Sequence, residues 1–132
     1  MLQIVLFNLI FAVAQPNQVA VQIRFISESE GGSVRMAWYT SESSFMEEAA
    51  GSASQKYVSD SLTITITVPN KPIAFTFYHD LNEDQELNTN VIGIPTEPYG
   101  FSMNARGRFG PPTYTECVFD PSTTQNLTIF LK

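Results

Sequence analysis

Strict alternation of apolar and polar side chains is the feature that most constrains the fold of this chain. Between Leu62 and Val68 every second residue is aliphatic, and the residues between them are threonines. Because successive side chains of a β-strand point to opposite faces of a sheet, a period of two indicates a half-buried strand. The same kind of pattern predicts strands in five further segments: 19–25, 34–38, 73–77, 115–119 and 127–131.

A short helix is predicted at one place between these strands. Ser44 and Glu47 fit a capping box, and Gly51 can end the helix. The stretch of small residues 49–54 is expected to be a loop, and the glycines of 30–33 suit a hairpin turn. With short spacing between turns and no alternation of strands with long helices, the sequence predicts an all-β fold, an antiparallel β-sandwich of about six or seven strands.

The first residues predict export. Met1–Ala14 is apolar apart from Gln3 and Asn8, and it ends in Ala-Val-Ala before Gln15. This pattern is typical of a secretory signal peptide, which leaves a single domain over residues 15–132. The alternative is a buried first strand. The segment is too short to span a bilayer, so a soluble secreted, periplasmic or cell-surface protein is expected.

Charge and cysteine content narrow the range of partners. The formal net charge of −6 argues against nucleic acid or an anionic membrane as the partner, which leaves a protein or a small molecule. Cys117 is the single cysteine, so no intramolecular disulfide can form, and its apolar neighbours predict a buried, unreactive thiol. Stability must then come from packing or from a bound ion.

The connection over residues 79–113 is the candidate functional face. It shows neither a strand nor a helix period, and connections of this length in a compact domain are usually functional. Its prolines restrict the backbone and favour an ordered loop. Its aromatic residues Tyr99, Phe101 and Phe109 are expected to point inward as anchors, the alternative being an exposed binding platform.

An alternating series of oxygen-bearing side chains opens this loop. Asp80, Asn82 and Asp84 stand at positions one, three and five of a D-x-N-x-D series, and Asn88 adds a further oxygen. Such side chains in a curling loop can converge on one calcium ion. The match to a calcium loop is partial, because Val91 stands where a bidentate Glu belongs. The alternative is a solvated turn in which the Asp and Asn side chains cap their own backbone.

Three charged or titratable residues flank this series. His79 directly precedes it and is a candidate base or metal ligand, although a structural hydrogen bond is the preferred interpretation. Arg106 and Arg108 can clamp a ligand carboxylate, but internal pairing with acidic residues of the same loop (Asp80, Asp84 or Glu97) is preferred. No nucleophile stands at a recognisable spacing from His79, so no catalytic residue is assigned.

The block HDLNEDQELNTNVIGIPTEPYGFSMNARGRFGPP resembles the hallmark of a secreted bacterial family known as domain of unknown function 2141. The matching positions are His79, Asp80, Asn82, Asp84, Asn88, Gly93, Pro95, Glu97, Tyr99, Gly100, Phe101, Asn104 and Ala105. The resemblance implies an exported β-sandwich similar to transthyretin-like modules, and it implies no activity. Gln85 departs from the family pattern by replacing a Gly, and Asn88 departs from it by replacing an Asp.

Three functions follow as hypotheses. The first is a non-enzymatic binding or structural module of the cell envelope, with the binding-loop residues His79, Glu97, Tyr99, Phe101, Asn104, Arg106 and Arg108 on its functional face. The second is a calcium-stabilised extracellular module. The third is a small hydrolase that uses His79 as its base. The sequence leaves the ligand and the oligomeric state open.

Overall fold

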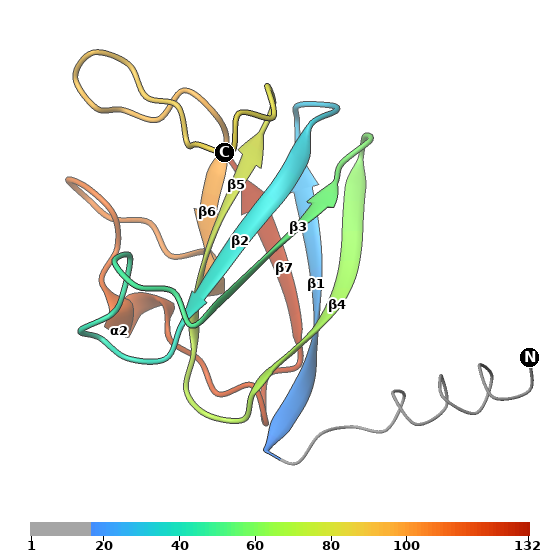
Figure 1. The fold of residues 1–132 in the computed structure, drawn as a ribbon, viewed down its shortest axis with the longest axis vertical. Coiled ribbons are helices and arrows are strands. Elements are labelled where there is room, and N and C mark those ends of the chain that lie inside the picture. Colours follow the sequence, from blue (N-terminus) through green and yellow to red (C-terminus); the bar gives the residue numbers. More distant parts are fainter. Residues whose placement is uncertain (1–16) are drawn as a thin grey trace, which may run out of the picture.

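Two β-sheets packed face to face make up the protein in a computed structural model, which describes residues 17–132 (Figure 1). The predicted signal peptide, Met1–Ala14, lies outside the described residues. The strands are β1 (Gln18–Ser27), β2 (Ser33–Tyr39), β3 (Gly51–Lys56), β4 (Ser61–Pro69), β5 (Ala74–Asp80), β6 (Tyr99–Phe101) and β7 (Asn126–Leu131). One sheet has the order β4-β1-β7 and the other the order β3-β2-β5-β6. The predicted all-β sandwich is therefore confirmed.

Strand pairing is antiparallel with one exception. Strands β1 and β7 pair in parallel, from Gln22 opposite Asn126 to Ser27 opposite Leu131. A parallel pair needs a long crossover connection, and almost the whole chain lies between these two strands. The glycines of 30–33 form no hairpin, because β1 and β2 belong to different sheets and this turn carries the chain between them.

The core lies between the two sheets and follows the predicted alternation. The inward side chains of β1, β2, β5 and β7 are almost completely buried: Val21, Ile23, Phe25, Val34, Met36, Phe75, Phe77, Leu127, Ile129 and Leu131. Phe25 and Phe77 meet edge to face across the sandwich, with 5.1 Å between their ring centroids. Burial of these side chains supplies the main driving force for folding.

The region between β2 and β4 differs from the prediction. The predicted helix over Ser44–Gly51 does not form. The Ser44 carbonyl oxygen accepts hydrogen bonds from the N–H groups of Glu47 and Glu48, which closes a single turn. The left-handed φ of 63° at Met46 prevents this turn from continuing as a helix. The stretch of small residues predicted as a loop instead forms β3. This edge strand pairs with β2 through its backbone, so its stability does not require an apolar face.

The helix lies elsewhere in the chain. The predicted strand at 115–119 is instead α2 (Tyr114–Cys117), a single turn that begins at Thr113. Thr113 and Glu116 form a complete capping box, and this local hydrogen bonding decides the conformation against the strand pattern. A 3₁₀ turn, η1 (Ser102–Asn104), follows β6. No helix within residues 17–132 is long and apolar enough to cross a membrane.

Candidate metal centre

The long connection divides into two loops. Strand β5 continues through His79 and Asp80, and β6 with η1 occupies residues 99–104. The remaining segments are loops 81–98 and 105–113, which project on the same side of the sandwich (Figure 1). The absence of a strand period therefore holds for most of this connection, but β6 pairs with β5 through three residues of each strand.

Three carboxylates meet where loop 81–98 leaves and rejoins the sheet. One oxygen each of Asp80, Asp84 and Glu97 lies within 4.8 Å of the other two. Asp80 is fully buried and Glu97 is 7% exposed, whereas Asp84 is exposed. We call these three residues the acidic cluster. They form the densest concentration of negative charge within the described part of the chain that could hold a metal ion.

Asp80 is bonded through one of its two oxygens. Its Oδ2 accepts from Arg35 Nε at 2.6 Å and from the Gln85 backbone N–H at 2.8 Å. Its Oδ1 is buried and has no hydrogen-bond partner among the described residues. A buried acceptor without a protein partner loses its hydration unless a cation or a water molecule binds to it, so Oδ1 is a candidate ligand atom.

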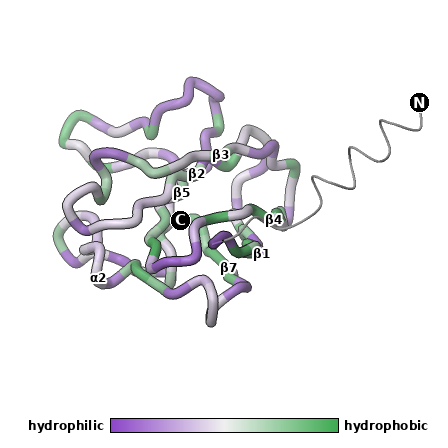
Figure 2. Tube along the Cα trace, turned by 60° about the horizontal axis from the view of Figure 1, so that its bottom comes forward, coloured by the Kyte–Doolittle hydropathy of each residue, from purple (hydrophilic) through white to green (hydrophobic). Residues whose placement is uncertain are grey.

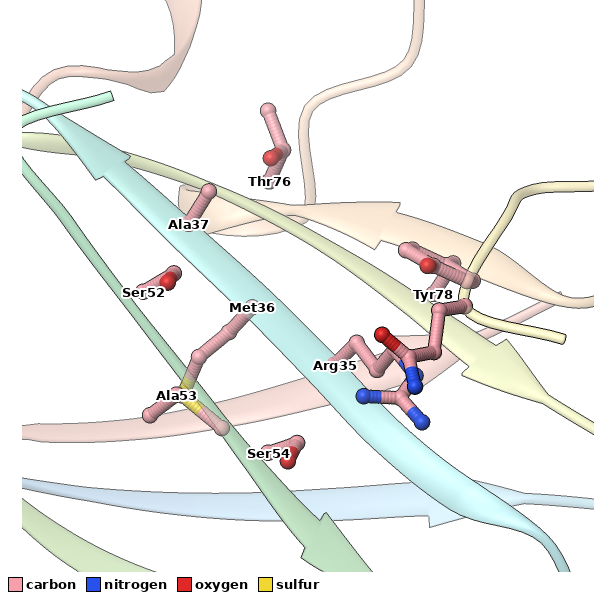
Figure 3. A pocket seen from close by; sticks show the side chains of 9 residues that line it. Arg35, Met36, Ala37, Ser52, Ala53, Ser54, Thr76 and Tyr78 are labelled. Atoms are coloured by element: carbon pink, nitrogen blue, oxygen red, sulfur yellow. The ribbon is translucent and has the colours of Figure 1, made fainter. Parts of the chain in front are cut away.

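Arg35 reaches the cluster from the neighbouring strand. The antiparallel register places Ser33 opposite Asp80 and Arg35 opposite Tyr78, so Arg35 and Asp80 are diagonal neighbours on the outer face of the sheet. Figure 3 shows Arg35 and Tyr78 at one end of a groove, whose remaining length is lined mostly by small side chains of β2, β3 and β5. The Asp80 carboxylate raises the pKa of Arg35 through their hydrogen bond.

Asn88 supplies a second oxygen of the same kind. Its Nδ2 donates to Asp84 Oδ2 at 2.7 Å, while its Oδ1 is buried and has no hydrogen-bond partner in the described part of the chain. The hydrogen bond from Asn88 is the main reason why the pKa of Asp84 is lowered, followed by the backbone N–H of Glu86. The Asp84 carboxylate is thus kept ionised down to low pH.

Glu97 closes the loop from its far end. Its Oε2 accepts from the Leu81 backbone N–H at 2.8 Å, and its Oε1 accepts from the Asn88 backbone N–H at 3.0 Å. One side chain therefore ties the start, the middle and the end of loop 81–98 together. A carboxylate oxygen has two acceptor positions, so each oxygen can still bind a cation while it keeps its hydrogen bond.

The donor set suits a hard cation. Asp80 Oδ1, Asn88 Oδ1, Asp84 and Glu97 offer carboxylate and amide oxygens, and no nitrogen or sulfur ligand lies in the cluster. Calcium binds six to eight such oxygens in variable geometry, with water completing the shell. Three carboxylates beside a single guanidinium carry excess negative charge, which a divalent cation would balance.

The structure places the four predicted calcium ligands in different surroundings. Asp80, Asp84 and Asn88 come together, whereas Asn82 is exposed and bonds only to Asp84, through its Oδ1 and Nδ2 at 3.3 Å each. Gln85, which replaces the family's Gly, adopts a left-handed φ of 67°. The backbone conformation that suits glycine is therefore present with a bulkier residue in it.

A second acidic contact anchors the loop outside the cluster. Glu83 binds Lys56 of β3 and the Ser33 hydroxyl, and these hydrogen bonds lower the pKa of Glu83. Glu83 thus joins loop 81–98 to the sheet edge through side chains that are all satisfied by protein partners. It provides a natural comparison for the acidic cluster.

His79 is enclosed in the core on the opposite face of β5. Its side chain is fully buried, with Nδ1 2.8 Å from the Ser27 hydroxyl and Nε2 2.5 Å from the Gly31 carbonyl oxygen. The ring also packs on Tyr57, 4.7 Å between centroids. Both nitrogens are used and neither reaches solvent, so the ring holds the turn between the two sheets.

The predicted pairing of Arg106 and Arg108 with loop carboxylates is wrong. Arg106 donates to the Tyr99 carbonyl oxygen at 2.8 Å and lies over the Tyr99 ring at 4.5 Å, because β6 separates it from the acidic cluster. Arg108 is exposed at the outer end of loop 105–113 and forms no ion pair within residues 17–132. The cation beside Asp80 is Arg35, which the sequence places on a strand far from the loop.

The aromatic residues and Asn104 have separate roles. Phe101 is 5% exposed and Tyr99 is half-buried, as expected of anchors, but Phe109 is 97% exposed, which contradicts the prediction for that residue. Phe109 stands on the outer turn of loop 105–113, which the sheet does not cover. Asn104 bridges to β7 by donating to the Thr128 carbonyl oxygen and accepting from the Phe130 N–H.

Sequence reasoning did not place Glu97 or Arg35 in the acidic cluster. Glu97 is predicted as a binding-loop residue and as a possible partner of Arg106 or Arg108, but its place beside Asp80 depends on how the loop closes. Arg35 carries no motif, but the strand register would have found it, because diagonal pairs on adjacent strands face each other.

Comparison with known proteins gives a family and a distant structural likeness. A family model described as "Uncharacterized protein conserved in bacteria (DUF2141)" matches residues 21–129. The tip fimbrial protein Mfa3 from Porphyromonas gingivalis, with a C-terminal truncation, is similar with 11% identity and a TM-score of 0.47, over 85% of this chain and 48% of that one. The chain thus spans about half the length of that protein. No curated protein matches.

Proposed function

The chain belongs to this family of uncharacterized bacterial proteins, and from that premise we propose that it is an exported, non-enzymatic binding or structural module of the cell envelope. We further propose that calcium, bound at the acidic cluster, holds its loop 81–98 in place. The single observation that carries the calcium proposal is the buried Oδ1 of Asp80, which has no hydrogen-bond partner among the described residues.

The alternative, a solvated turn that caps its own backbone, accounts for part of the geometry. Asn82 and Asp84 do accept hydrogen bonds from backbone N–H groups two residues later. Backbone capping does not account for Asp80 Oδ1, which is buried beside two further carboxylates and bonds to none of the loop's N–H groups. An ion explains both the unsatisfied oxygen and the concentration of charge.

Calcium fits better than other common cations. The cluster contains only oxygen ligands, which disfavours zinc, whose sites use histidine and cysteine. The ligands come from a loop and a strand end, an adaptable arrangement that suits the variable coordination of calcium more than the strict octahedron of magnesium. A site with few dedicated ligands is expected to be weak and to suit the millimolar calcium found outside cells.

Export rests on the first residues of the sequence. Met1–Ala14 has the apolar run and the Ala-Val-Ala exit of a secretory signal. Cell fractionation followed by N-terminal sequencing tests this part. We expect a mature protein outside the cytoplasm that begins at Gln15, and an uncleaved cytoplasmic protein would contradict export.

A hydrolase that uses His79 is not supported by the surroundings of this residue. A general base must reach the proton that it removes, and the His79 ring is fully buried with both nitrogens in hydrogen bonds. The Cys117 thiol is also buried, and this burial raises its pKa to about 11 and disfavours the reactive thiolate.

Thermal unfolding of the mature protein tests the calcium proposal. With calcium at about ten times its Kd, mass action predicts a gain of about 1.4 kcal/mol, or roughly 5 °C in Tm. Asp80→Asn should abolish this gain, whereas the control Asp120→Asn, which removes the charge of an exposed turn residue outside the cluster, should keep it. An equal rise in wild type and Asp80→Asn, or no rise in wild type, would refute a site at the cluster.

A further inference from the structure

Two loop tips carry large apolar side chains into solvent. Val91, Ile92 and Ile94 on loop 81–98 are 103%, 75% and 54% exposed, and Phe109 on loop 105–113 is 97% exposed. We call these four residues the loop-tip patch. Figure 2 shows the hydrophobic stretch at the outer tip of loop 81–98, beyond a hydrophilic stretch near the strand end. Clustered exposed apolar side chains mark interaction sites.

A groove of about 500 Å³ lies between the two tips. Its floor is formed by Tyr99 and Phe101 of β6, and Met46 and Leu87 contribute further apolar surface at its sides. Arg108 is the single charged residue among those that line it. The lining of the groove is therefore mainly apolar and includes one cation.

The backbone of loop 105–113 offers unpaired polar groups at its tip. From residue 106 to residue 110, no backbone N–H or C=O group makes a backbone hydrogen bond with another described residue. This segment is a bent turn: the Gly110 carbonyl oxygen occupies the space where a Cβ on Gly107 would stand, and Pro111 and Pro112 have no N–H. A peptide main chain carries both donors and acceptors, so it can bond to individual groups of this turn.

The charge of the lining further restricts the chemical class of ligand that the groove can bind. The protein as a whole carries a formal charge of −6, and the exposed guanidinium of Arg108 places a positive charge in the lining of the groove. An apolar ligand with one carboxylate would match the groove, because Arg presents a planar fork of donors to a carboxylate.

From these features we propose that the groove between the loop tips binds an extended polypeptide segment with apolar side chains and one acidic group. The apolar side chains enter the groove between Ile92 and Phe109, the peptide backbone bonds to individual N–H and C=O groups of residues 106–110, and the carboxylate meets Arg108. An increase of this binding by calcium is a second expectation. It rests on the proposed function, because the acidic cluster fixes the base of the loop that forms one wall.

Selection from a phage-displayed library of random heptapeptides tests the proposal, with the mature protein in calcium as bait. We expect enriched peptides with apolar residues and an Asp or Glu. For synthetic copies of these peptides, the Kd should be roughly ten times higher or more with the double variant Ile92→Ser/Phe109→Ser than with wild type, because two apolar anchors are lost. Arg108→Gln should weaken binding about threefold and remove the acidic preference. Val58→Ser, an exposed apolar residue outside the patch, is the control.

Three results would overturn the proposal. One is the absence of any enriched peptide, and another is equal binding of the enriched peptides to wild type and to the double variant. The third is that Ile92 and Phe109 instead mediate dimerisation, seen by analytical ultracentrifugation, or adsorption to neutral phosphatidylcholine vesicles. Peptide binding that persists in chelator would leave the groove intact and count only against its coupling to calcium.

Discussion

His79 and Asp80 are consecutive, fully buried and polar, yet their surroundings differ completely. His79 points into the core, where both ring nitrogens have partners from β1 and from the turn that follows it. Asp80 points to the outer face of the sheet, under loop 81–98, and its Oδ1 has no hydrogen-bond partner within residues 17–132. The same strand end thus carries one polar group bonded through both of its nitrogens and one bonded through a single oxygen.

The difference separates a structural role from a binding role. A buried group with every hydrogen bond made needs nothing more, and its function is to fix the fold. A buried carboxylate oxygen without a protein partner, next to two more carboxylates, is costly unless a cation, a proton or a water molecule satisfies it. We therefore expect the two neighbouring residues to respond differently to mutation and to calcium, and the following predictions test that contrast.

Removal of the His79 ring should have the largest effect. His79→Ala leaves a cavity against Tyr57 and deprives the Ser27 hydroxyl and the Gly31 carbonyl of their partners, so we expect a loss of about 3 kcal/mol in unfolding free energy. Urea unfolding measures it. The gain on adding calcium should remain as in wild type, and its disappearance would mean that His79 belongs to the metal site.

Glu97→Gln should reduce the free energy of unfolding less than His79→Ala does, but it should remove the stabilisation by calcium. The amide keeps one acceptor for the loop backbone but removes a negative charge from the acidic cluster. We expect the calcium-dependent gain of about 1.4 kcal/mol at ten times the Kd to be lost. Calorimetric titration with calcium measures the effect, with Asp120→Asn, an exposed turn residue distant in sequence, as control. Unchanged affinity would remove Glu97 from the site.

The pH dependence should follow Asp84. Its pKa is lowered in the folded state, chiefly by Asn88, so its contribution to stability is present above its unfolded pKa near 3.8 and is lost as the pH falls through its folded value. Calcium affinity should weaken over the same acidic range, because protonation removes a ligand. Titrations between pH 3 and pH 7 test this, and Asn88→Ala should move the loss of calcium affinity to higher pH.

The smallest effect is expected at Gln85. Its left-handed backbone costs a residue with a side chain roughly 1 kcal/mol, which glycine avoids. Gln85→Gly should therefore be neutral or stabilising by up to about 1 kcal/mol, without loss of calcium binding. Thermal unfolding measures it. A clear destabilisation would show that the Gln85 side chain, rather than its backbone, supports the loop.

The sheets could be predicted because burial on one face imposes a period of two. Leu62–Val68 shows this pattern and forms β4, and the alternation of residues 19–25 likewise lies within β1. Where local hydrogen bonding competes with the pattern, the prediction failed. Thr113 and Glu116 make a capping box that turns the expected strand at 115–119 into α2. Strand β3 has almost no apolar pattern, because it is held at the sheet edge mainly by backbone pairing with β2, and of its side chains Ala53 packs against the core.

The site could be predicted only as far as it is local in sequence. Asp80 and Asp84 stand in a recognisable series, and both belong to the acidic cluster. Glu97 and Arg35 reach Asp80 through loop closure and strand register, which depend on the whole fold. The sequence predicts that Arg108 pairs with an acidic residue of the loop and that Phe109 points inward, but both side chains are exposed to solvent. Sequence alone does not show which side of a loop faces outward.

A crystal structure of the mature protein grown with calcium, with anomalous data to identify the ion, tests the central claim most directly. The account predicts an anomalous peak within about 2.3–2.6 Å of Asp80 Oδ1, with oxygens of Asp84, Glu97 and Asn88 in the same shell. A water molecule at this position, or an Asp80 Oδ1 hydrogen-bonded to protein with no ion nearby, would contradict it.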